Sequence, residues 1–222
     1  MKHSILAVSL IIFSAFAIRA AQIPIASLPV VITKAGTYYF PTNMYMPTPT
    51  TMPQAVVAIT VNALGPVTID MRGFTLTGPG QQFVQGFYTN PVGITIASNN
   101  VAILNGKIQG FVDGISASGS VVGIPNVYTY LSGLNIENIT FGPEPFSCLI
   151  MSLVNGAVVK NCDFSQQVDG DVVGDDGSQT GNFYINDKVN ISNSIMTYTA
   201  ASELPGGKPT PDAVVNIVPI RN

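Results

Sequence analysis

This chain has no tryptophan, a single histidine and few charged residues. The shortages of histidine and of charge each exclude classes of function. The one histidine, His3, lies in an N-terminal apolar segment, so the remaining chain has no imidazole for a Ser-His-Asp or Cys-His nucleophile or for a metal site. Only 9% of the residues are charged. Without Lys2 and Arg19 of that segment, seven basic residues stand against twelve acidic ones, a net charge of −5. Nucleic-acid binding needs clustered Lys and Arg, so we expect no nucleic-acid partner.

Cysteine is also scarce, with only Cys148 and Cys162 present. In an exported protein the two could form a disulfide. Alternatively, both are buried thiols that pack as small apolar residues. Their separation of 14 residues does not match one coil of the repeat found below, which favours the thiols without deciding between the two.

Long apolar runs are absent beyond the N-terminus. Residues 4–18 are almost wholly apolar, and small residues follow at Ala20 and Ala21. This pattern predicts a secretory signal peptide over residues 1–21. A membrane anchor is the alternative, but the apolar run is shorter than the ~20 residues that span a bilayer. We therefore expect a secreted protein (extracellular, periplasmic or at the cell surface) with no membrane span after cleavage.

What the chain does contain is a repeated motif, apolar-x-apolar-x-Asn-x-x-apolar. Its five copies cover residues 67–74, 101–108, 134–141, 157–164 and 189–196. The central apolar residues are separated by 34, 33, 23 and 32 positions, and repeats of this size indicate a stacked solenoid. Apolar and polar residues alternate inside each copy, which indicates that the unit is built of strands.

A second short strand precedes four of the five copies. A turn of small or polar residues separates this strand from the motif that follows it. We expect these strands at residues 94–96, 127–129, 149–151 and 183–185. The unit predicts an all-β, right-handed parallel β-helix of five to six coils, with successive coils about 4.8 Å apart. We expect an N-terminal cap with a proline-rich connection over residues 22–54 and the β-helix over residues 55–222. No helix is visible that would cap the C-terminal end, so end-to-end self-association is possible.

Asparagine recurs at one position of the motif. The four copies that contain it have Asn105, Asn138, Asn161 and Asn193. Asn tolerates the left-handed backbone of a tight bend better than other non-glycine residues, and stacked amides can bond along a ladder. We therefore assign these residues a structural role. Met71 takes this place in the first copy, so we expect the ladder to start at the second coil.

Three of the gaps between motifs exceed 23 by about ten residues, which places insertions at residues 78–91, 111–126 and 165–182. Because equivalent positions of stacked coils lie above one another, we expect the three loops to form one wall of a groove. The second loop carries Asp113. Aromatic residues in or beside the first two loops are candidates for stacking on sugar rings, or for covering the sheet: Phe83, Phe87, Tyr88, Tyr128 and Tyr130.

The third loop is strongly acidic, with Asp169, Asp171, Asp175 and Asp176 inside eight positions. Carboxylates so close repel one another unless they are solvated, protonated or bridged by a cation. A calcium ion would accept several of these oxygens, although the spacing matches no standard calcium loop. Paired carboxylates could also act as acid and base on a glycosidic bond. A solvated, glycine-rich loop is the third interpretation.

The sequence of residues 67–78, followed by residues 93–96 and 101–110, resembles the pectate-lyase-like superfamily of right-handed β-helix proteins. The resemblance covers about residues 55–200 and is specific for the fold. Members include lyases, hydrolases, tailspikes and surface proteins, so the resemblance implies a fold more than an activity.

Catalytic signatures carry over only in part. Polygalacturonase-like members have Asn-Thr-Asp, Asp-Asp, Gly-His-Gly and Arg-Ile-Lys elements, and this chain matches the Asp-Asp element alone, at Asp175 and Asp176. Pectate-lyase-like members use calcium carboxylates and a basic residue that abstracts a proton. Arg72, Lys107 and Lys160 are candidates for that base, but an exposed coil position explains each of them equally well.

The resulting hypothesis is a secreted β-helix protein that interacts with an extracellular or envelope polysaccharide without catalysis. The first alternative is a calcium-dependent polysaccharide lyase or glycoside hydrolase that uses the acidic loop. The second is a structural or adhesive surface module.

Overall fold

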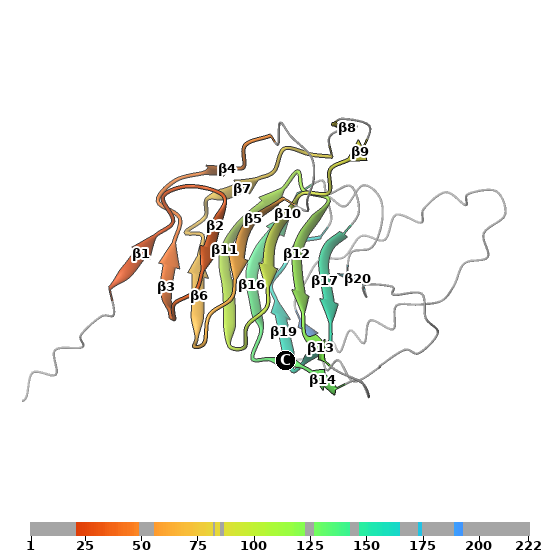
Figure 1. The fold of residues 1–222 in the computed structure, drawn as a ribbon. Coiled ribbons are helices and arrows are strands. Elements are labelled where there is room, and N and C mark those ends of the chain that lie inside the picture. Colours follow the sequence, from red (N-terminus) through yellow and green to blue (C-terminus); the bar gives the residue numbers. More distant parts are fainter. Residues whose placement is uncertain are drawn as a thin grey trace, which may run out of the picture.

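The computed structural model is all-β. It describes residues 21–48, 56–81, 83–84, 87–122, 127–142, 147–164, 173–174 and 189–192. Within these residues there is no helix, and most strands belong to two parallel sheets that run side by side through the molecule (Figure 1).

The nine-stranded sheet pairs in the order β1-β3-β6-β11-β16-β19-β21, and β4 and β7 pair beside that path. Its strands are β1 (Gln22–Pro24), β3 (Gly36–Tyr39), β4 (Met44–Tyr45), β6 (Val67–Asp70), β7 (Thr75–Thr77), β11 (Val101–Gln109), β16 (Asn135–Phe141), β19 (Ala157–Lys160) and β21 (Val189–Ser192).

The six-stranded sheet pairs in the order β2-β5-β10-β12-β17-β20. Its strands are β2 (Val30–Ile32), β5 (Val57–Val61), β10 (Val92–Ile96), β12 (Asp113–Ser118), β17 (Ser147–Ser152) and β20 (Val173–Gly174).

Three small strand pairs lie outside these sheets. Two are antiparallel hairpins, formed by β8 (Phe83–Val84) with β9 (Phe87–Tyr88) and by β13 (Ser120–Val122) with β14 (Val127–Thr129). The third is the parallel pair of β15 (Leu131–Ser132) and β18 (Val154–Asn155).

The chain passes from the six-stranded sheet to the nine-stranded sheet and back, and each passage stacks on the one before. One turn contains β5, β6 and β7, the next contains β10 and β11, and the following one contains β12 and β16. The pairings between these turns are all parallel. The prediction of a parallel β-solenoid is therefore confirmed. The right-handed winding and the five to six coils stay predictions.

The predicted division into a cap (residues 22–54) and a β-helix (residues 55–222) also stays a prediction. The strands β2, β3 and β4 pair in parallel with β5, β6 and β7, so regular strands already occur in the segment expected to be a cap. Residues 49–55 of the proline-rich connection lie outside the described residues.

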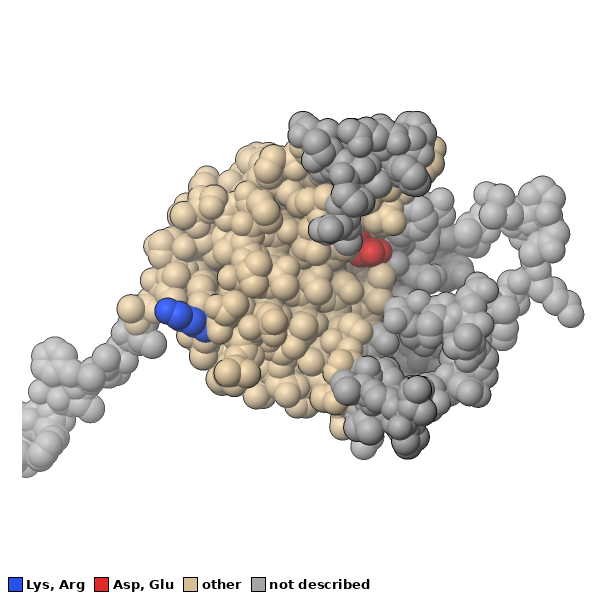
Figure 2. Space-filling view, in the orientation of Figure 1, with Lys and Arg blue, Asp and Glu red and all other residues tan. Residues whose placement is uncertain are grey.

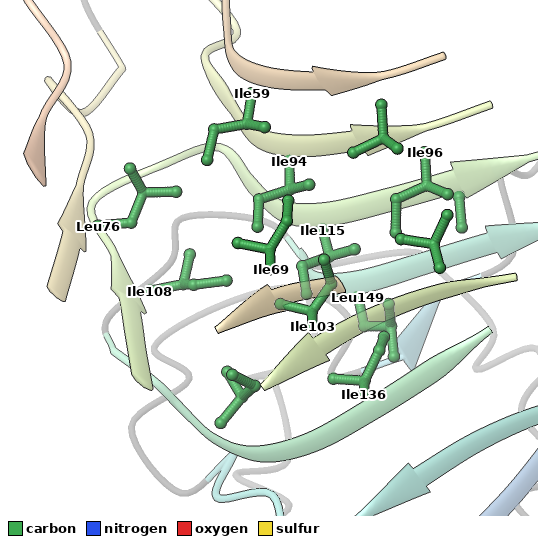
Figure 3. Close-up of a cluster of buried hydrophobic side chains, with 14 of the residues drawn as sticks. Ile59, Ile69, Leu76, Ile94, Ile96, Ile103, Ile108, Ile115, Ile136 and Leu149 are labelled. Atoms are coloured by element: carbon green, nitrogen blue, oxygen red, sulfur yellow. The ribbon is translucent and has the colours of Figure 1, made fainter. Parts of the chain in front are cut away.

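Rows of apolar side chains fill the space between the two sheets. Each sheet contributes residues that pair in register from turn to turn, and Figure 3 shows both rows pointing into one interior: Ile59, Ile94, Ile115 and Leu149 from one sheet, and Ile69, Ile103 and Ile136 from the other. All seven are 0% exposed. Because burial of one such side chain is worth about 1.5–3 kcal/mol, the alternation of apolar residues fixes which face of each strand points inward.

The expectation that residues 127–129 form the second strand of a coil is wrong, although they do form a strand. Residues 94–96 of β10 pair with residues 115–117 of β12, which in turn pair with residues 149–151 of β17. Residues 127–129 form β14 of a hairpin instead. The sequence misleads here because Ile115-Ser-Ala117 has a weaker strand propensity than Val127-Tyr-Thr129, although the small Ala117 is fully buried in its ladder. Residues 183–185 lie outside the described residues.

The first copy of the motif is two residues longer than the others, because Ile69 pairs with Ile103 and Leu76 pairs with Ile108. Ile108 pairs with Leu76, so Phe74 does not occupy the expected ladder position. The left-handed residue of this copy is Arg72, with φ 53°, and Gly73 follows with φ 80°. Two extra residues are therefore accommodated in the bend.

The left-handed conformation predicted for the repeated asparagines is confirmed where the structure describes them. The φ angles are 56° at Asn105, 57° at Asn138 and 52° at Asn161. Asn193 lies outside the described residues.

Candidate functional site

The first two predicted insertions do not emerge from one side of the solenoid. Residues 78–91 contain the β8–β9 hairpin and lead from the nine-stranded sheet into β10 of the six-stranded sheet. The β13–β14 hairpin lies on the way back, between β12 and β16. Because the strands of the six-stranded sheet are parallel, the two hairpins lie at opposite ends of its strands, at the top and bottom of Figure 1. The predicted single wall is therefore wrong for these two loops.

The pairing of β12 with β10 places Asp113 beside the β8–β9 hairpin. Asp113 is the first residue of β12 and pairs with Val92 of β10, and the Val112 N–H donates to the Pro91 carbonyl at 2.8 Å. Tyr88 ends β9 a few residues earlier and is 66% exposed. The fold thus brings a carboxyl group to the base of a hairpin that presents an exposed aromatic ring.

We call this place the hairpin corner and define it by Tyr88, Asn90 and Asp113. Asn90 is exposed, and its Oδ1 accepts a hydrogen bond from Nε2 of Gln81 at 3.4 Å. The corner therefore combines an exposed tyrosine side chain, an exposed amide and a half-buried carboxyl group. These are the kinds of group that stack on a sugar ring and bond to its hydroxyls.

Asp113 is half-buried, and this burial raises the pKa of its carboxyl group above the ordinary value of 3.8. The physical cause is desolvation, because removing the carboxylate from water disfavours its charged form. Ionised, this carboxyl group accepts hydrogen bonds from hydroxyl groups, and protonated it can also donate one.

Hydroxyl side chains form a row across the outer face of the six-stranded sheet. Thr60, Thr95 and Ser116 pair in register on β5, β10 and β12. They alternate with buried residues, so their side chains point outward. In the described strands of this sheet, Asp113 is the only charged residue. On the face that Figure 2 shows, almost all of the described surface is neither acidic nor basic.

Most charged side chains of the described part belong instead to the nine-stranded sheet and its bends. They are Asp70, Arg72, Lys107, Glu137, Lys160 and Asp163. Lys160 Nζ lies 3.6 Å from Glu137 Oε1 on the neighbouring strand. Exposed pairs of this kind contribute about 0–1 kcal/mol, so they add little to stability.

The asparagine ladder runs across the bends of this same sheet. The Asn161 Nδ2 donates to Asn138 Oδ1 at 3.0 Å, and the Asn138 Nδ2 donates to Asn105 Oδ1 at 2.9 Å. The Asn105 Nδ2 then donates to Asp70 Oδ1 at 3.1 Å. The ladder of amides therefore starts at the second coil, as expected, and a carboxylate from the preceding coil terminates it.

Two residues suggested as catalytic bases, Arg72 and Lys107, lie on the nine-stranded sheet and not at the hairpin corner. The Arg72 guanidinium carbon is 3.6 Å from the centre of the Tyr39 ring, and an Arg72 amino group donates to Gln22 Oε1. Lys107 pairs with Thr75 and Thr140, and its side chain runs close to Gly142. Arg72 thus holds β1 and β3 together, which is a structural task.

Several other predicted site residues fall where the structure gives no description. The acidic loop residues Asp169, Asp171, Asp175 and Asp176 lie outside the described residues, as do the side chains of Phe83, Phe87 and Tyr128. Tyr130 is described and half-buried, next to β15. Their roles in binding sugar or metal stay predictions. Among the described residues, no three metal-ligating side chains come together.

Both cysteines are buried thiols, and they are not joined in a disulfide. The Cys162 thiol donates to the carbonyls of Lys160 and Ile136, at 3.4 and 3.6 Å. Burial raises the pKa of Cys162 to about 11. A thiol of this kind is almost wholly protonated at neutral pH, so it is a poor nucleophile.

Asp113 could have been placed from the sequence with one further comparison. The run Val92-Gly-Ile-Thr-Ile96 shares Gly-Ile and a following hydroxyl residue with Asp113-Gly-Ile-Ser-Ala117, at a separation close to one coil. The two runs pair in parallel as β10 and β12. This three-residue likeness was the available signal, and the strand propensity of residues 115–117 is weaker than that of the competing strand at residues 127–129.

Comparison of the chain with protein-family models, with curated proteins and with solved structures finds no match. In the part of the chain that the structure describes, no helix has the length and apolarity to cross a membrane.

Proposed function

We propose that this protein binds an extracellular or envelope polysaccharide without cleaving it, and that the hairpin corner is where it does so. The observation that carries the proposal is the pairing of Asp113 with Val92, which sets a half-buried carboxyl group at the base of the aromatic hairpin. An exposed ring next to hydrogen-bonding groups is the usual composition of a site that takes a polar ligand with apolar faces.

The outer face of the six-stranded sheet supports this assignment. Its row of Thr60, Thr95 and Ser116 crosses three strands with a repeat of about 4.8 Å, the spacing of paired strands, and Ser116 lies three residues after Asp113 on β12. Hydroxyl groups both donate and accept hydrogen bonds, so a periodic row of them suits a polymer rich in hydroxyls. The absence of other charges on the described strands of this sheet favours a neutral or weakly charged polymer.

Export and family membership belong to the same proposal. Residues 1–21 act as a secretory signal peptide, so the mature protein meets its polymer outside the cytoplasm. The solenoid is a right-handed β-helix of the pectate-lyase-like superfamily, which the motif at residues 67–78 and 101–110 suggests. The parallel stacking of the described turns is compatible with that family.

The lack of catalysis rests on the separation of the chemical groups. Asp113 lies on the six-stranded sheet, while Arg72 and Lys107 belong to the nine-stranded sheet. A proton abstractor and a charge-stabilising group need to reach one substrate atom from about 3 Å. The alternative function, a calcium-dependent lyase or hydrolase, depends on the acidic loop at residues 169–176.

Gel filtration of polysaccharides with the purified protein tests the proposal. A panel of neutral and acidic polymers is incubated with the protein, once with calcium and once with chelator. We expect the protein to co-elute with at least one polymer whose chain length stays unchanged. Shortened polymer in calcium alone would establish the lyase or hydrolase instead. No co-elution with any polymer would favour the structural or adhesive module.

A matched pair of tyrosine variants locates the site. Tyr88→Ala should weaken binding about tenfold, the cost typical of losing one well-placed aromatic contact. Tyr45→Ala is the control, because Tyr45 is 68% exposed on β4 and lies away from the hairpin corner. Equal losses in both variants, or no loss in Tyr88→Ala, would remove the hairpin corner as the binding site.

A further inference from the structure

The chain contains two Asn-Gly dipeptides, at Asn105-Gly106 and Asn155-Gly156. Asparagine followed by glycine is the sequence most prone to spontaneous loss of the side-chain amide, because glycine has no side chain to hinder its own backbone nitrogen. The two pairs lie in different surroundings, so the structure decides which of them reacts.

The amide of Asn105 is held at both of its ends. Its Nδ2 donates to Asp70 Oδ1 at 3.1 Å, and its Oδ1 accepts from Asn138 Nδ2 at 2.9 Å. The backbone at Asn105 is left-handed, with φ 56°. Gly106 is fixed by packing as well, since a Cβ there would overlap the Cβ of Met71. The amide cannot turn towards the Gly106 nitrogen without breaking both of its hydrogen bonds.

Asn155 has an open environment. It is exposed at the end of the short strand β18, where its backbone pairs with Ser132 of β15. Gly156 has φ 81°, and a Cβ at Gly156 would meet nothing within 4 Å. The amide of Asn155 therefore has room to approach the backbone nitrogen of Gly156.

We propose that Asn155 is a deamidation site of the folded protein, and that the asparagine ladder protects Asn105 from the same reaction. The Gly156 nitrogen attacks Cγ of Asn155, forming an N–Cγ bond. The Cγ–Nδ2 bond breaks, and ammonia leaves with the proton that the Gly156 nitrogen gives up. Solvent water then opens the cyclic imide to aspartate or isoaspartate, which adds one negative charge at this position.

Protection of Asn105 has a reason beyond its own stability. An aspartate at position 105 would set a second carboxylate against Asp70 and could no longer donate to it. Two like charges at hydrogen-bond distance repel each other, so deamidation there would break the ladder at its first step. The same change at Asn155 affects an exposed side chain at the end of the short β15–β18 pair.

Mass-spectrometric peptide mapping of the whole protein, aged in mildly alkaline buffer, tests the proposal. Reaction at Asn105 requires both ladder bonds to open, so in the folded protein it should be about tenfold slower or more than at Asn155. In urea both sites should react at similar rates. Equal rates in the folded protein, or an unreactive Asn155, would overturn the proposal.

A variant at Asn138 shows whether the ladder hydrogen bonds or the backbone conformation protects Asn105 from deamidation. Asn138→Gly removes the donor to Asn105 Oδ1, and glycine accepts the φ of 57° found at this position. If the ladder protects Asn105, its deamidation in folded Asn138→Gly should be several-fold faster than in the wild type, with Asn155 unchanged. An unchanged rate at Asn105 would show that the ladder gives no protection.

Discussion

Asp70 and Asn105 lie on neighbouring coils, and Asp70 Oδ1 accepts a hydrogen bond of 3.1 Å from Asn105 Nδ2. The same oxygen accepts from the Arg72 backbone N–H at 2.9 Å. Each asparagine above it donates to the one below, so every amide bond of the ladder points towards Asp70. A carboxylate suits the last position because it accepts hydrogen bonds without needing to donate one.

Loss of a ladder amide should destabilise the fold. Asn138→Ala breaks two side-chain hydrogen bonds and puts alanine at φ 57°, so we expect the free energy of unfolding to fall by about 2–4 kcal/mol. Asn138→Gly loses the same bonds without the left-handed strain and should cost about 1 kcal/mol less. Urea unfolding of both variants measures the difference. Equal losses would mean that the left-handed backbone carries no strain for alanine.

A pair of glycines provides a test of close packing. Gly106→Ala puts a methyl group onto the Met71 Cβ, so we expect a loss of about 2–3 kcal/mol from overpacking. Gly156→Ala has open space around it but φ 81°, so it should cost only about 1 kcal/mol from strain. Thermal unfolding followed by circular dichroism compares the two. We expect Gly106→Ala to have the lower melting temperature, and a lower melting temperature for Gly156→Ala would contradict the prediction.

Asp113→Asn should change how stability depends on pH. Burial raises the pKa of Asp113 above 3.8, so the folded state holds this proton more tightly than the unfolded state. The stability from this group is full below its unfolded pKa and is lost as pH rises through the folded pKa. We therefore expect the Asp113→Asn variant to gain stability relative to the wild type between about pH 3 and pH 7.

Urea unfolding at several pH values measures that gain. The quantity of interest is the variant's free energy of unfolding minus that of the wild type. A difference that stays flat across the pH range, or that falls as pH rises, would mean that Asp113 is not desolvated in the folded protein.

The two thiols should be unreactive until the protein unfolds. Cys148 and Cys162 are both buried, and the pKa of Cys162 is raised to about 11, so neither presents an accessible thiolate at neutral pH. A chromogenic disulfide reagent should detect no fast-reacting thiol in the native protein and two in urea. Fast native reaction of either cysteine would contradict its burial, and no reaction in urea would reveal a disulfide.

The solenoid could be predicted from the sequence because its signals are local and repeated. Alternation of apolar residues fixes the buried face of each strand, and the asparagine spacing marks the left-handed bends, as at Asn105 and Asn138. The registers of Ile69, Ile103 and Ile136 agree with the motif alignment. These features need only the chain's own stereochemistry, so they can be read without knowing which segments meet.

The places where insertions leave the stack depend instead on contacts between coils. A strand of weak propensity such as residues 115–117 is selected by the ladder above and below it, and residues 127–129, whose strand propensity is stronger, become part of a hairpin. That choice moves one loop to the opposite end of the sheet and brings Asp113 to the β8–β9 hairpin. The amino-acid order alone thus specifies a repeating β-structure with left-handed asparagine bends. Non-local pairing specifies which groups share a corner, because register depends on the neighbouring strands as much as on the strand itself.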